Sequence, residues 1–377
     1  MTRTILVAGG GTAGHVFPAL AVAAELAAQP GIEPVFVGVD DRLEARLVPE
    51  AGYRLHTIDA VAIPRRPSAA LLRVPSRLRA AVRRCREIIA EEEPLAAVTF
   101  GGYVSFPLDR AAHRAGVPLV IHEQNSIPGL ANRVAARWAD HVAVTFPGSA
   151  KRFPREERCV VTGNPVRADL VGLDRAAGRA DARTRLGLDP EVTTLLVFGG
   201  SQGAESLNRA LVAAYPRLPG PLQIVHATGR RGYDDAVERW EPVVSEDGPR
   251  VTTVAFIDDM AAAYAAADVT VCRSGATSIA ELTALGIPAV LVPYPHATAD
   301  HQTENARALA AAGGAVTIAD EELTGASLAE ALTPLLADPA ARREMSRNSR
   351  VFGRPDAAAQ VARLTLEVAG APDGGGS

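Results

Sequence analysis

Short apolar runs alternate with stretches of helical periodicity along most of the chain. In the first half these runs are TILVA (4–8), PVFVG (34–38), LAAVTF (95–100), PLVIH (118–122), HVAVT (141–145) and RCVVTG (158–163). Each has the length of a buried strand, and the first is followed by a helical pattern near residues 18–29. Strands that alternate with helices predict parallel sheets with right-handed crossovers.

This alternation stops after Asp169 and begins again at residue 194. The intervening LVGLDRAAGRADARTRLGLDPEV (170–192) is charged and irregular, which predicts a linker. The second series begins with TLLVFGG (194–200) and continues through LQIVHATG, RVTTVAFI, DVTVCR and PAVLVPY. We therefore expect an α/β fold of two Rossmann-like domains that face a cleft, each a parallel sheet flanked by helices. Their expected bounds are 1–168 and 169–351, and a helix at about 352–369 is expected to pack back on the first domain.

The composition agrees with two globular domains and excludes several classes of protein. A length of 377 residues exceeds one ordinary core, and 47% hydrophobic with 22% charged residues is typical of a soluble protein. The formal charge of −4 gives no indication of nucleic-acid binding. The three cysteines lack metal-ligand spacing, and neither a signal peptide nor a membrane-spanning run is expected.

Both halves begin with a strand, a glycine-rich turn and a helix, ILVAGGGTAGH and LLVFGGSQGAE. Such turns place backbone N–H groups at a helix N-terminus, which favours an anion; tight packing alone would also explain the glycines. Gly9, Gly11 and Gly14 have the G-x-G-x-x-G spacing of a dinucleotide loop, and Asp40 follows the second strand. His15 comes next, where a neutral imidazole can accept a proton from a substrate hydroxyl or merely bond to the loop.

Polar residues also follow other predicted strands of the first half. FGGYVSFP places Gly101, Gly102, Tyr103 and Ser105 after one strand, and HEQNSIPG places His122, Glu123, Gln124 and Asn125 after another. TGNPVR adds Asn164 and Arg167 at the end of the first domain. Because the carboxyl ends of parallel strands meet at one edge, a shared site is favoured over ordinary loop capping.

The second half carries a pattern that suits a nucleotide diphosphate. After the strand DVTVC, residues Ser274, Gly275, Ala276 and Thr277 begin a helix and offer backbone N–H groups, while Ser201 is a donor in the other glycine loop. Glu281 shares a helix face with Thr277 and can grip both hydroxyls of a ribose, although a solvated charge is the alternative. The backbone of Ile257 can meet a base edge, and Asp300, His301, Gln302 and Asn305 suit sugar hydroxyls. No D-x-D pair is present, so no metal site is predicted.

A basic stretch in the first half suggests a membrane surface. Arg65, Arg66 and Arg73 lie beside Leu71 and Leu72, a combination that suits an anionic bilayer. The helix that follows has an apolar stripe formed by Leu78, Val82, Cys85 and Ile89, which is expected to face the core.

Taken in order, these motifs resemble the MurG family of glycosyltransferases. The resemblance rests on GGGTAGHVFPALAVA, FGGYVSFP, HEQNSIPGLANR, TGNPVR, FGGSQGAESLN, FIDDMAAAYAAADVTVCRSGATSIAEL and HQTENA, and it covers nearly the whole chain. It implies the two-domain GT-B fold and inverting transfer of N-acetylglucosamine from UDP-GlcNAc to lipid I, without a cofactor or a bound metal. Lipid I is a muramyl pentapeptide on undecaprenyl diphosphate. The implied location is peripheral, on the cytoplasmic face of a bacterial membrane. The implied partners are the anionic membrane surface and other proteins of cell-wall synthesis, and no nucleic acid is expected to bind.

The resemblance also implies roles for individual residues. From the second half of the chain, Ile257 would bind uracil, Glu281 the ribose, and Gln302 the sugar, while the diphosphate would be bound by Ala276, Thr277 and Ser201. From the first half, Asn125 would also bind the sugar and Arg167 would lie beside the nucleotide. The opposite wall of the donor site would be formed by Thr12, Ala13 and Gly14. His15 would be the base, and Gly101, Gly102, Tyr103 and Gln124 would serve the acceptor, whose diphosphate would approach the first domain's glycine loops. Ala13 departs from the family pattern, in which glycine is usual. Three alternatives stay open, namely a UDP-GlcNAc 2-epimerase, an NAD-linked dehydrogenase and a non-catalytic nucleotide-sugar sensor.

Overall fold

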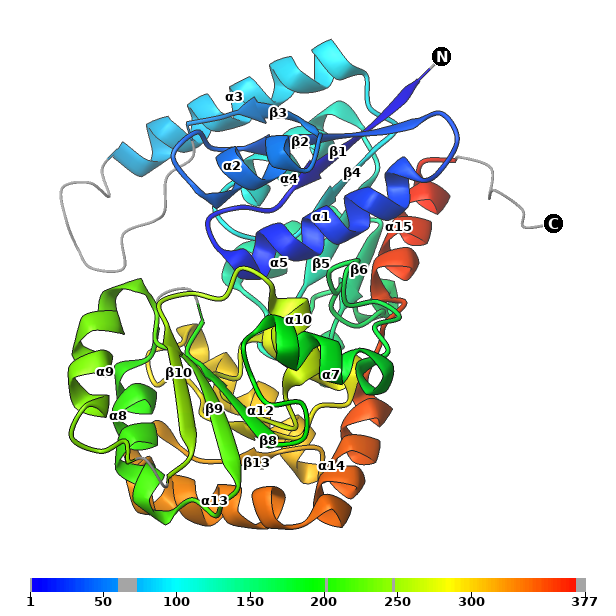
Figure 1. The fold of residues 1–377 in the computed structure, drawn as a ribbon. Helices are drawn as coiled ribbons and strands as arrows, with labels where there is room; N and C mark the ends of the chain where they lie inside the picture. Colours follow the sequence, from blue (N-terminus) through cyan, green and yellow to red (C-terminus); the bar gives the residue numbers. More distant parts are fainter. Residues whose placement is uncertain (1, 60–72, 201–202, 246–247, 371–377) are drawn as a thin grey trace. The chain divides into compact units, whose positions relative to one another are not determined.

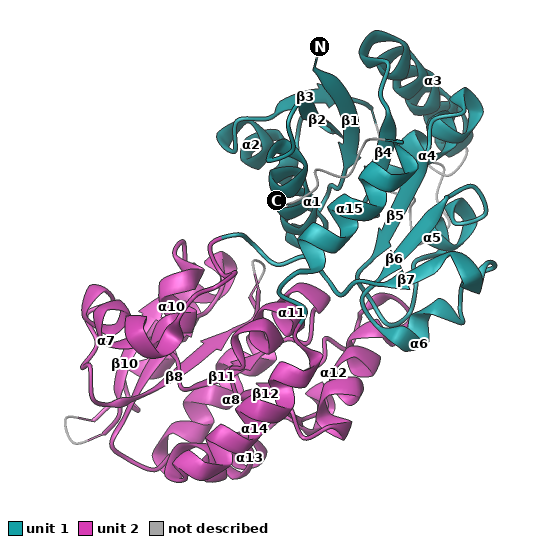
Figure 2. Ribbon diagram, turned by 90° about the vertical axis from the view of Figure 1, so that its right-hand side faces the viewer, with its two compact units in different colours: residues 1–168, 354–377 teal, residues 169–353 magenta. Residues whose placement is uncertain are grey.

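The computed structural model describes residues 2–59, 73–200, 203–245 and 248–370 (Figure 1). The chain divides into two compact units (Figure 2). Unit 1 comprises residues 1–168 and 354–377, and unit 2 comprises residues 169–353. Among the described residues, no helix is both long enough and apolar enough to cross a bilayer.

Unit 1 contains a parallel sheet of seven strands in the order β3-β2-β1-β4-β5-β6-β7. The strands are β1 Arg3–Ala8, β2 Ile32–Gly38, β3 Arg54–Thr57, β4 Ala96–Thr99, β5 Leu119–Glu123, β6 His141–Val144 and β7 Cys159–Val161. The helices are α1 Ala13–Ala27, α2 Leu43–Glu50, α3 Val74–Glu92, α4 Ser105–Ala115, α5 Leu130–Ala135, α6 Pro147–Ala150 and α15 Ala357–Val368.

Strand β1 shows why its apolar run is continuous. Ile5 and Val7 are buried in one cluster with residues of α1 and α15, whereas Leu6 and Ala8 are buried in another with residues of α3 and α4. A strand covered on both faces has no solvent-facing position, which explains the lack of alternation. Helices α1 and α15 contact each other although they lie at opposite ends of the sequence (Figure 1).

Helix α3 confirms the predicted apolar stripe. Val82, Cys85 and Ile89 are buried, and Leu78 packs against the same cluster. Arg73 immediately precedes the helix, whereas Arg65 and Arg66 lie outside the described residues.

Unit 2 contains a parallel sheet of six strands in the order β10-β9-β8-β11-β12-β13. The strands are β8 Thr193–Phe198, β9 Leu222–Ala227, β10 Arg250–Val254, β11 Val269–Cys272, β12 Ala289–Leu291 and β13 Val316–Thr317. The helices are α7 Arg175–Arg185, α8 Glu205–Ala214, α9 Tyr233–Trp240, α10 Met260–Ala266, α11 Ala276–Leu285, α12 His301–Ala311, α13 Gly325–Ala337 and α14 Pro339–Phe352.

The prediction of an irregular linker over residues 170–192 is wrong for about half of them, because residues 175–185 form α7. Asp174 caps this helix by accepting from the backbone N–H groups of Ala176 and Ala177. Two of its arginines are buried and donate to carbonyls at the end of α10, Arg175 to Tyr264 O at 2.9 Å and Arg183 to Ala266 O at 3.1 Å. The charges that suggested a loop therefore satisfy the last carbonyls of a neighbouring helix.

Each sheet has one point at which the strand order changes direction. In unit 1 this point lies between β1 and β4, and in unit 2 it lies between β8 and β11. Ligands of open parallel sheets bind outside the carboxyl ends of the strands at such switch points. The glycine loops after β1 and β8, and the loops after β4 and β11, are therefore the places to look for sites.

Candidate functional site

His15 lies in the first turn of α1, beside the unit 1 switch point. Its Nδ1 is 3.1 Å from the carbonyl oxygen of Gly10 and 3.1 Å from Oγ1 of Thr12. A carbonyl oxygen only accepts, so Nδ1 carries the proton and donates, and the lone pair resides on Nε2. This tautomer, inferred from the hydrogen bonds, gives His15 the acceptor that a general base requires.

The loop after β4 packs closely against the loop after β1. Gly101 and Gly102 both have positive φ, +80° and +82°. A Cβ on Gly102 would lie 2.6 Å from the Gly10 carbonyl oxygen, and one on Gly101 would lie 3.5 Å from Nε2 of His15. These two predicted acceptor residues are therefore adjacent to His15, and their lack of side chains keeps room beside the imidazole.

One loop amide that was expected to serve a phosphate is already used within unit 1. The N–H of Gly11 donates to Oε2 of Glu44 at 3.0 Å. Glu44 comes from α2 and is only 1% exposed. Tyr103 packs on the other side of Gly11, where a Cβ would meet its ring at 2.8 Å. The position of Glu44 weighs against the dinucleotide alternative. Glu44 is the carboxylate that lies against the loop, whereas Asp40, the acid that the dinucleotide pattern offers after the second strand, is exposed.

In the HEQN run, His122, Glu123 and Gln124 are buried and form hydrogen bonds within unit 1, whereas Asn125 is half-buried. His122 donates to Gly163 O at 2.9 Å, and Gln124 donates to Phe100 O at 2.7 Å; both are buried. Burial lowers the pKa of His122 to about 4, which keeps the imidazole neutral.

Glu123 binds the loop that follows its own strand. Its carboxylate accepts from the backbone N–H groups of Asn125 and Gly129, at 3.0 Å each, and from Nδ2 of Asn132 at 2.9 Å. Burial raises the pKa of Glu123 against these hydrogen bonds, which lower it. Asn125, half-buried, is thereby fixed at the carboxyl end of β5, where a sugar ligand was expected.

Two residues of TGNPVR lie near the end of β7. The Arg167 guanidinium lies 5.5 Å from the ring of Phe17, which places it beside α1. Asn164 is buried, and within the described part of the chain neither atom of its amide group has a hydrogen-bond partner.

In unit 2, the loop after β11 leads directly into α11. Ala276 is the first residue of that helix, and the Oγ1 of Thr277 is buried with no hydrogen-bond partner among the described residues. Glu281 lies one turn further on and is 7% exposed, so the alternative of a solvated charge is wrong. Its Oε2 accepts from the hydroxyl of the fully buried Tyr264 at 2.8 Å.

Arg273 connects the two loops at this switch point, a role that the sequence analysis missed. It donates from Nη1 to the carboxylate of Asp320 and from Nη2 to Oγ of Ser206 at 2.9 Å. Ser206 belongs to α8, after the glycine loop of β8, and itself donates to Asp320 at 2.7 Å. An arginine at a strand end was the only signal in the sequence, and its partner Asp320 lies 47 residues away.

Gln302 and Asn305 of α12 are joined to the same loop. The Oγ of Ser274 donates to the backbone carbonyl of Gln302 at 2.9 Å, and Nδ2 of Asn305 lies 3.4 Å from Ser274 O. Gln302 also accepts from the N–H of Tyr294 at 3.0 Å. Ile257 lies half-buried between β10 and α10, and Ser201 lies outside the described residues.

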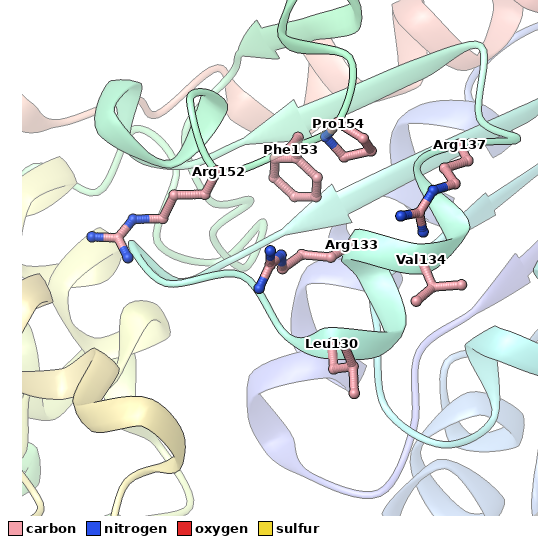
Figure 3. Close-up of a pocket in the computed structure, with 7 residues that line it drawn as sticks. All are labelled: Leu130, Arg133, Val134, Arg137, Arg152, Phe153 and Pro154. Carbon is pink, nitrogen blue, oxygen red and sulfur yellow. The ribbon is translucent and has the colours of Figure 1, made fainter.

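A separate pocket of about 320 Å³ lies on unit 1 between α5 and the segment after α6. Figure 3 shows its side chains, Leu130, Arg133, Val134, Arg137, Arg152, Phe153 and Pro154. Leu130 is 76% exposed and lines the pocket together with Arg133, Arg137 and Arg152. The pocket therefore combines an apolar surface with positive charge.

The sheets and loops agree with comparisons to known proteins. Residues 5–144 match the N-terminal domain of glycosyltransferase family 28, and residues 194–361 match its C-terminal domain. A crystal structure of MurG from Acinetobacter baumannii is 31% identical, with a TM-score of 0.77, and the match covers 97% of this chain and all of that one. The fold and these matches define a glycosyltransferase of the GT-B fold.

A relative from Nocardioides sp. strain JS614 is 44% identical over 366 residues, 97% of this chain and 98% of its own. It is named UDP-N-acetylglucosamine--N-acetylmuramyl-(pentapeptide) pyrophosphoryl-undecaprenol N-acetylglucosamine transferase. The chain belongs to this family, the MurG transferases. The UDP-GlcNAc 2-epimerase of Neisseria meningitidis, bound to UDP-GlcNAc, has a TM-score of 0.69 over 97% of this chain and all of its own, but at 12% identity it shares the fold alone.

Proposed function

We propose that this protein transfers N-acetylglucosamine from UDP-GlcNAc to the 4-hydroxyl of the muramyl pentapeptide of lipid I, forming lipid II for peptidoglycan. The observation that carries the proposal is the pairing of a helix N-terminus with a buried carboxylate at the unit 2 switch point. Glu281 lies about one turn into α11 and is 7% exposed, so a ribose bound by this carboxylate would have its diphosphate directed to the N–H groups at the helix start.

Unit 2 would hold the donor. Ala276 and Thr277 would donate to the diphosphate, and the unpartnered Oγ1 of Thr277 supports this role. Glu281 would accept from both ribose hydroxyls, the backbone of Ile257 would meet uracil, and Gln302 would bind the sugar. As the glycosidic bond to UDP breaks, the α11 N–H groups and helix dipole would stabilise the charge on the departing diphosphate.

Unit 1 would supply the base and the acceptor surface. The muramyl 4-hydroxyl attacks the anomeric carbon, its proton passes to Nε2 of His15, and UDP leaves. Attack from the face opposite the leaving group inverts the configuration. The adjacent Gly101 and Gly102 would admit the acceptor, and Tyr103 and Gln124 would border it. Asn125 would bind the donor sugar, and Arg167 would lie beside the nucleotide. The wall of the donor site opposite unit 2 would be formed by Thr12, Ala13 and Gly14.

The lipid acceptor would meet the protein at the cytoplasmic face of the membrane. The pocket in Figure 3 supports this placement, because Leu130 can enter the interface while Arg133, Arg137 and Arg152 attract anionic headgroups. Other proteins of cell-wall synthesis would be its neighbours there.

Incubation with labelled UDP-GlcNAc and a soluble lipid I analogue tests the proposal. Release of UDP together with a β-1,4-linked disaccharide supports it. Epimerised sugar, or binding without turnover, contradicts it. His15→Ala separates the base from the binding groups, since retention of full turnover at saturating substrates would exclude His15 as the base.

A further inference from the structure

The carboxylate of Glu44 lies directly behind the loop that ends at His15. Two glycines of unit 1 make room for Glu44. A Cβ on Gly10 would lie 2.4 Å from Oε1 of Glu44, and a Cβ on Gly38 would lie 2.8 Å from its Cγ. These glycines therefore admit a buried carboxylate, in addition to shaping a turn for a ligand.

Glu44 and His15 hold opposite ends of one peptide group. The peptide between Gly10 and Gly11 directs its N–H to Oε2 of Glu44 at 3.0 Å and its carbonyl oxygen to Nδ1 of His15 at 3.1 Å. A trans peptide is planar, and its N–H and C=O point in opposite directions. Fixing the N–H end therefore fixes the direction of the carbonyl.

A peptide between two glycines is easily turned over, because neither residue has a Cβ to restrict its dihedral angles. In the opposite orientation it would present an N–H to the imidazole. Nδ1 would then accept, and the proton would move to Nε2. The hydroxyl of Thr12, which also contacts Nδ1, can donate or accept and fits either tautomer, so the orientation of this peptide favours one nitrogen of His15 over the other as the base.

We propose that Glu44 is a positioning residue that locks the Gly10–Gly11 peptide and thereby holds His15 in the tautomer with an accepting Nε2. This inference rests on the proposed role of His15 as the base. Glu44 acts through the backbone and is not expected to touch either substrate. The second carboxylate oxygen, Oε1, has no hydrogen-bond partner in the described part of the chain, so the hydrogen bond from the Gly11 N–H orients the carboxylate.

The test compares two side chains of nearly equal length, Glu44→Gln and Glu44→Met. Glutamine retains an oxygen that can accept from Gly11, whereas methionine fills the space without a comparable acceptor. Glu50→Met on the exposed side of α2 is the matched control, since Glu50 forms a surface ion pair with Arg46.

The first readout is the ¹⁵N spectrum of histidine-labelled protein, with His15→Ala used to assign the resonances of His15. We expect the Nδ1-protonated pattern of His15 in wild type, in Glu44→Gln and in the control Glu50→Met. In Glu44→Met we expect a mixture of the two tautomers. The second readout is transfer, for which kcat should fall about tenfold in Glu44→Met, the value of one lost hydrogen bond, while the KM for UDP-GlcNAc stays within about twofold.

A wild-type histidine spectrum in Glu44→Met overturns the inference. An equal fall of kcat in Glu44→Gln and Glu44→Met overturns it as well. If Glu44→Met fails to fold, Glu44→Asp decides the same question, because its carboxylate is one methylene too short to reach Gly11. The spectrum requires no turnover. Failure of the proposed function would instead appear as full activity in His15→Ala, whatever the tautomer.

Discussion

The hydroxyl of Tyr264 provides a direct way to weaken the proposed ribose carboxylate without touching it. Tyr264→Phe removes the donor that contacts Oε2 of Glu281 at 2.8 Å and retains the ring in its buried position. The backbone carbonyl of Tyr264, which accepts from Arg175, is unaffected. The substitution therefore removes the hydrogen bond to Glu281 and leaves the backbone contact in place.

The magnitude follows from the charge and burial of the acceptor. A hydrogen bond to a charged group contributes about 1.5–3 kcal/mol, because a buried carboxylate oxygen that loses its donor keeps its desolvation cost. Glu281 is 7% exposed, so water only partly replaces the hydroxyl. We expect the Kd for UDP to rise about tenfold, which corresponds to about 1.4 kcal/mol, with the remainder lost from folding stability.

Isothermal titration of UDP without acceptor measures this effect on binding alone. Tyr53→Phe is the control, because Tyr53 packs against Phe36 in unit 1 and its phenol should not influence the nucleotide. A thermal melt of each variant gives the stability part. If Tyr264→Phe loses stability but binds UDP within about twofold of wild type, the bond serves the fold only and the proposed orientation of Glu281 is refuted.

Three further variants test a buried carboxyl group, a helix of unit 2 and the basic pocket of unit 1. Burial raises the pKa of Asp109 to about 7, so the folded state binds a proton that the unfolded state has released, and stability falls as pH rises from about 4 to 7. Between pH 5 and pH 8 this loss is about 3 kcal/mol, because the folded-state pKa of about 7 lies about 2 pH units above pH 5. Asp109→Asn should remove the loss in urea unfolding at these two pH values, and an unchanged pH slope would contradict this. Gly178→Ala should stabilise α7 by about 0.5–1 kcal/mol, since nothing lies within 4 Å of a Cβ there, and a lower melting temperature would show hidden strain. Changing Arg133, Arg137 and Arg152 to glutamate should reduce flotation with anionic liposomes, and undiminished flotation would reject the pocket in Figure 3 as the lipid contact.

The sheets and their glycine loops were predictable because their signals are local. Apolar runs of strand length alternate with helical patterns, and the order of parallel strands then brings the loops after β1 and β4 together. The same reasoning placed the RSGATS loop at the start of α11. The residues after β1, β4 and β11 therefore lie at the two switch points, whereas Gln124 and Asn125 follow β5, and Asn164 and Arg167 follow β7.

The errors and omissions concern contacts between distant residues. Glu281 was open to reading as a solvated charge because a helix pattern does not reveal a buried Tyr264 beside it. Arg175 and Arg183 looked like loop residues because their partners are carbonyls of another helix. Glu44 was missed since its contact with Gly11 spans 33 residues and leaves no short motif.

Formation of a β-linked disaccharide on a lipid-linked muramyl acceptor is the reaction proposed for this protein. The most direct measurement incubates purified protein with UDP-GlcNAc and a soluble lipid I analogue, and follows UDP and disaccharide together by chromatography and NMR of the anomeric proton. We expect equal amounts of UDP and β-linked product. Release of UDP without disaccharide, an α-linked product, or conversion of the donor sugar to its 2-epimer would contradict it.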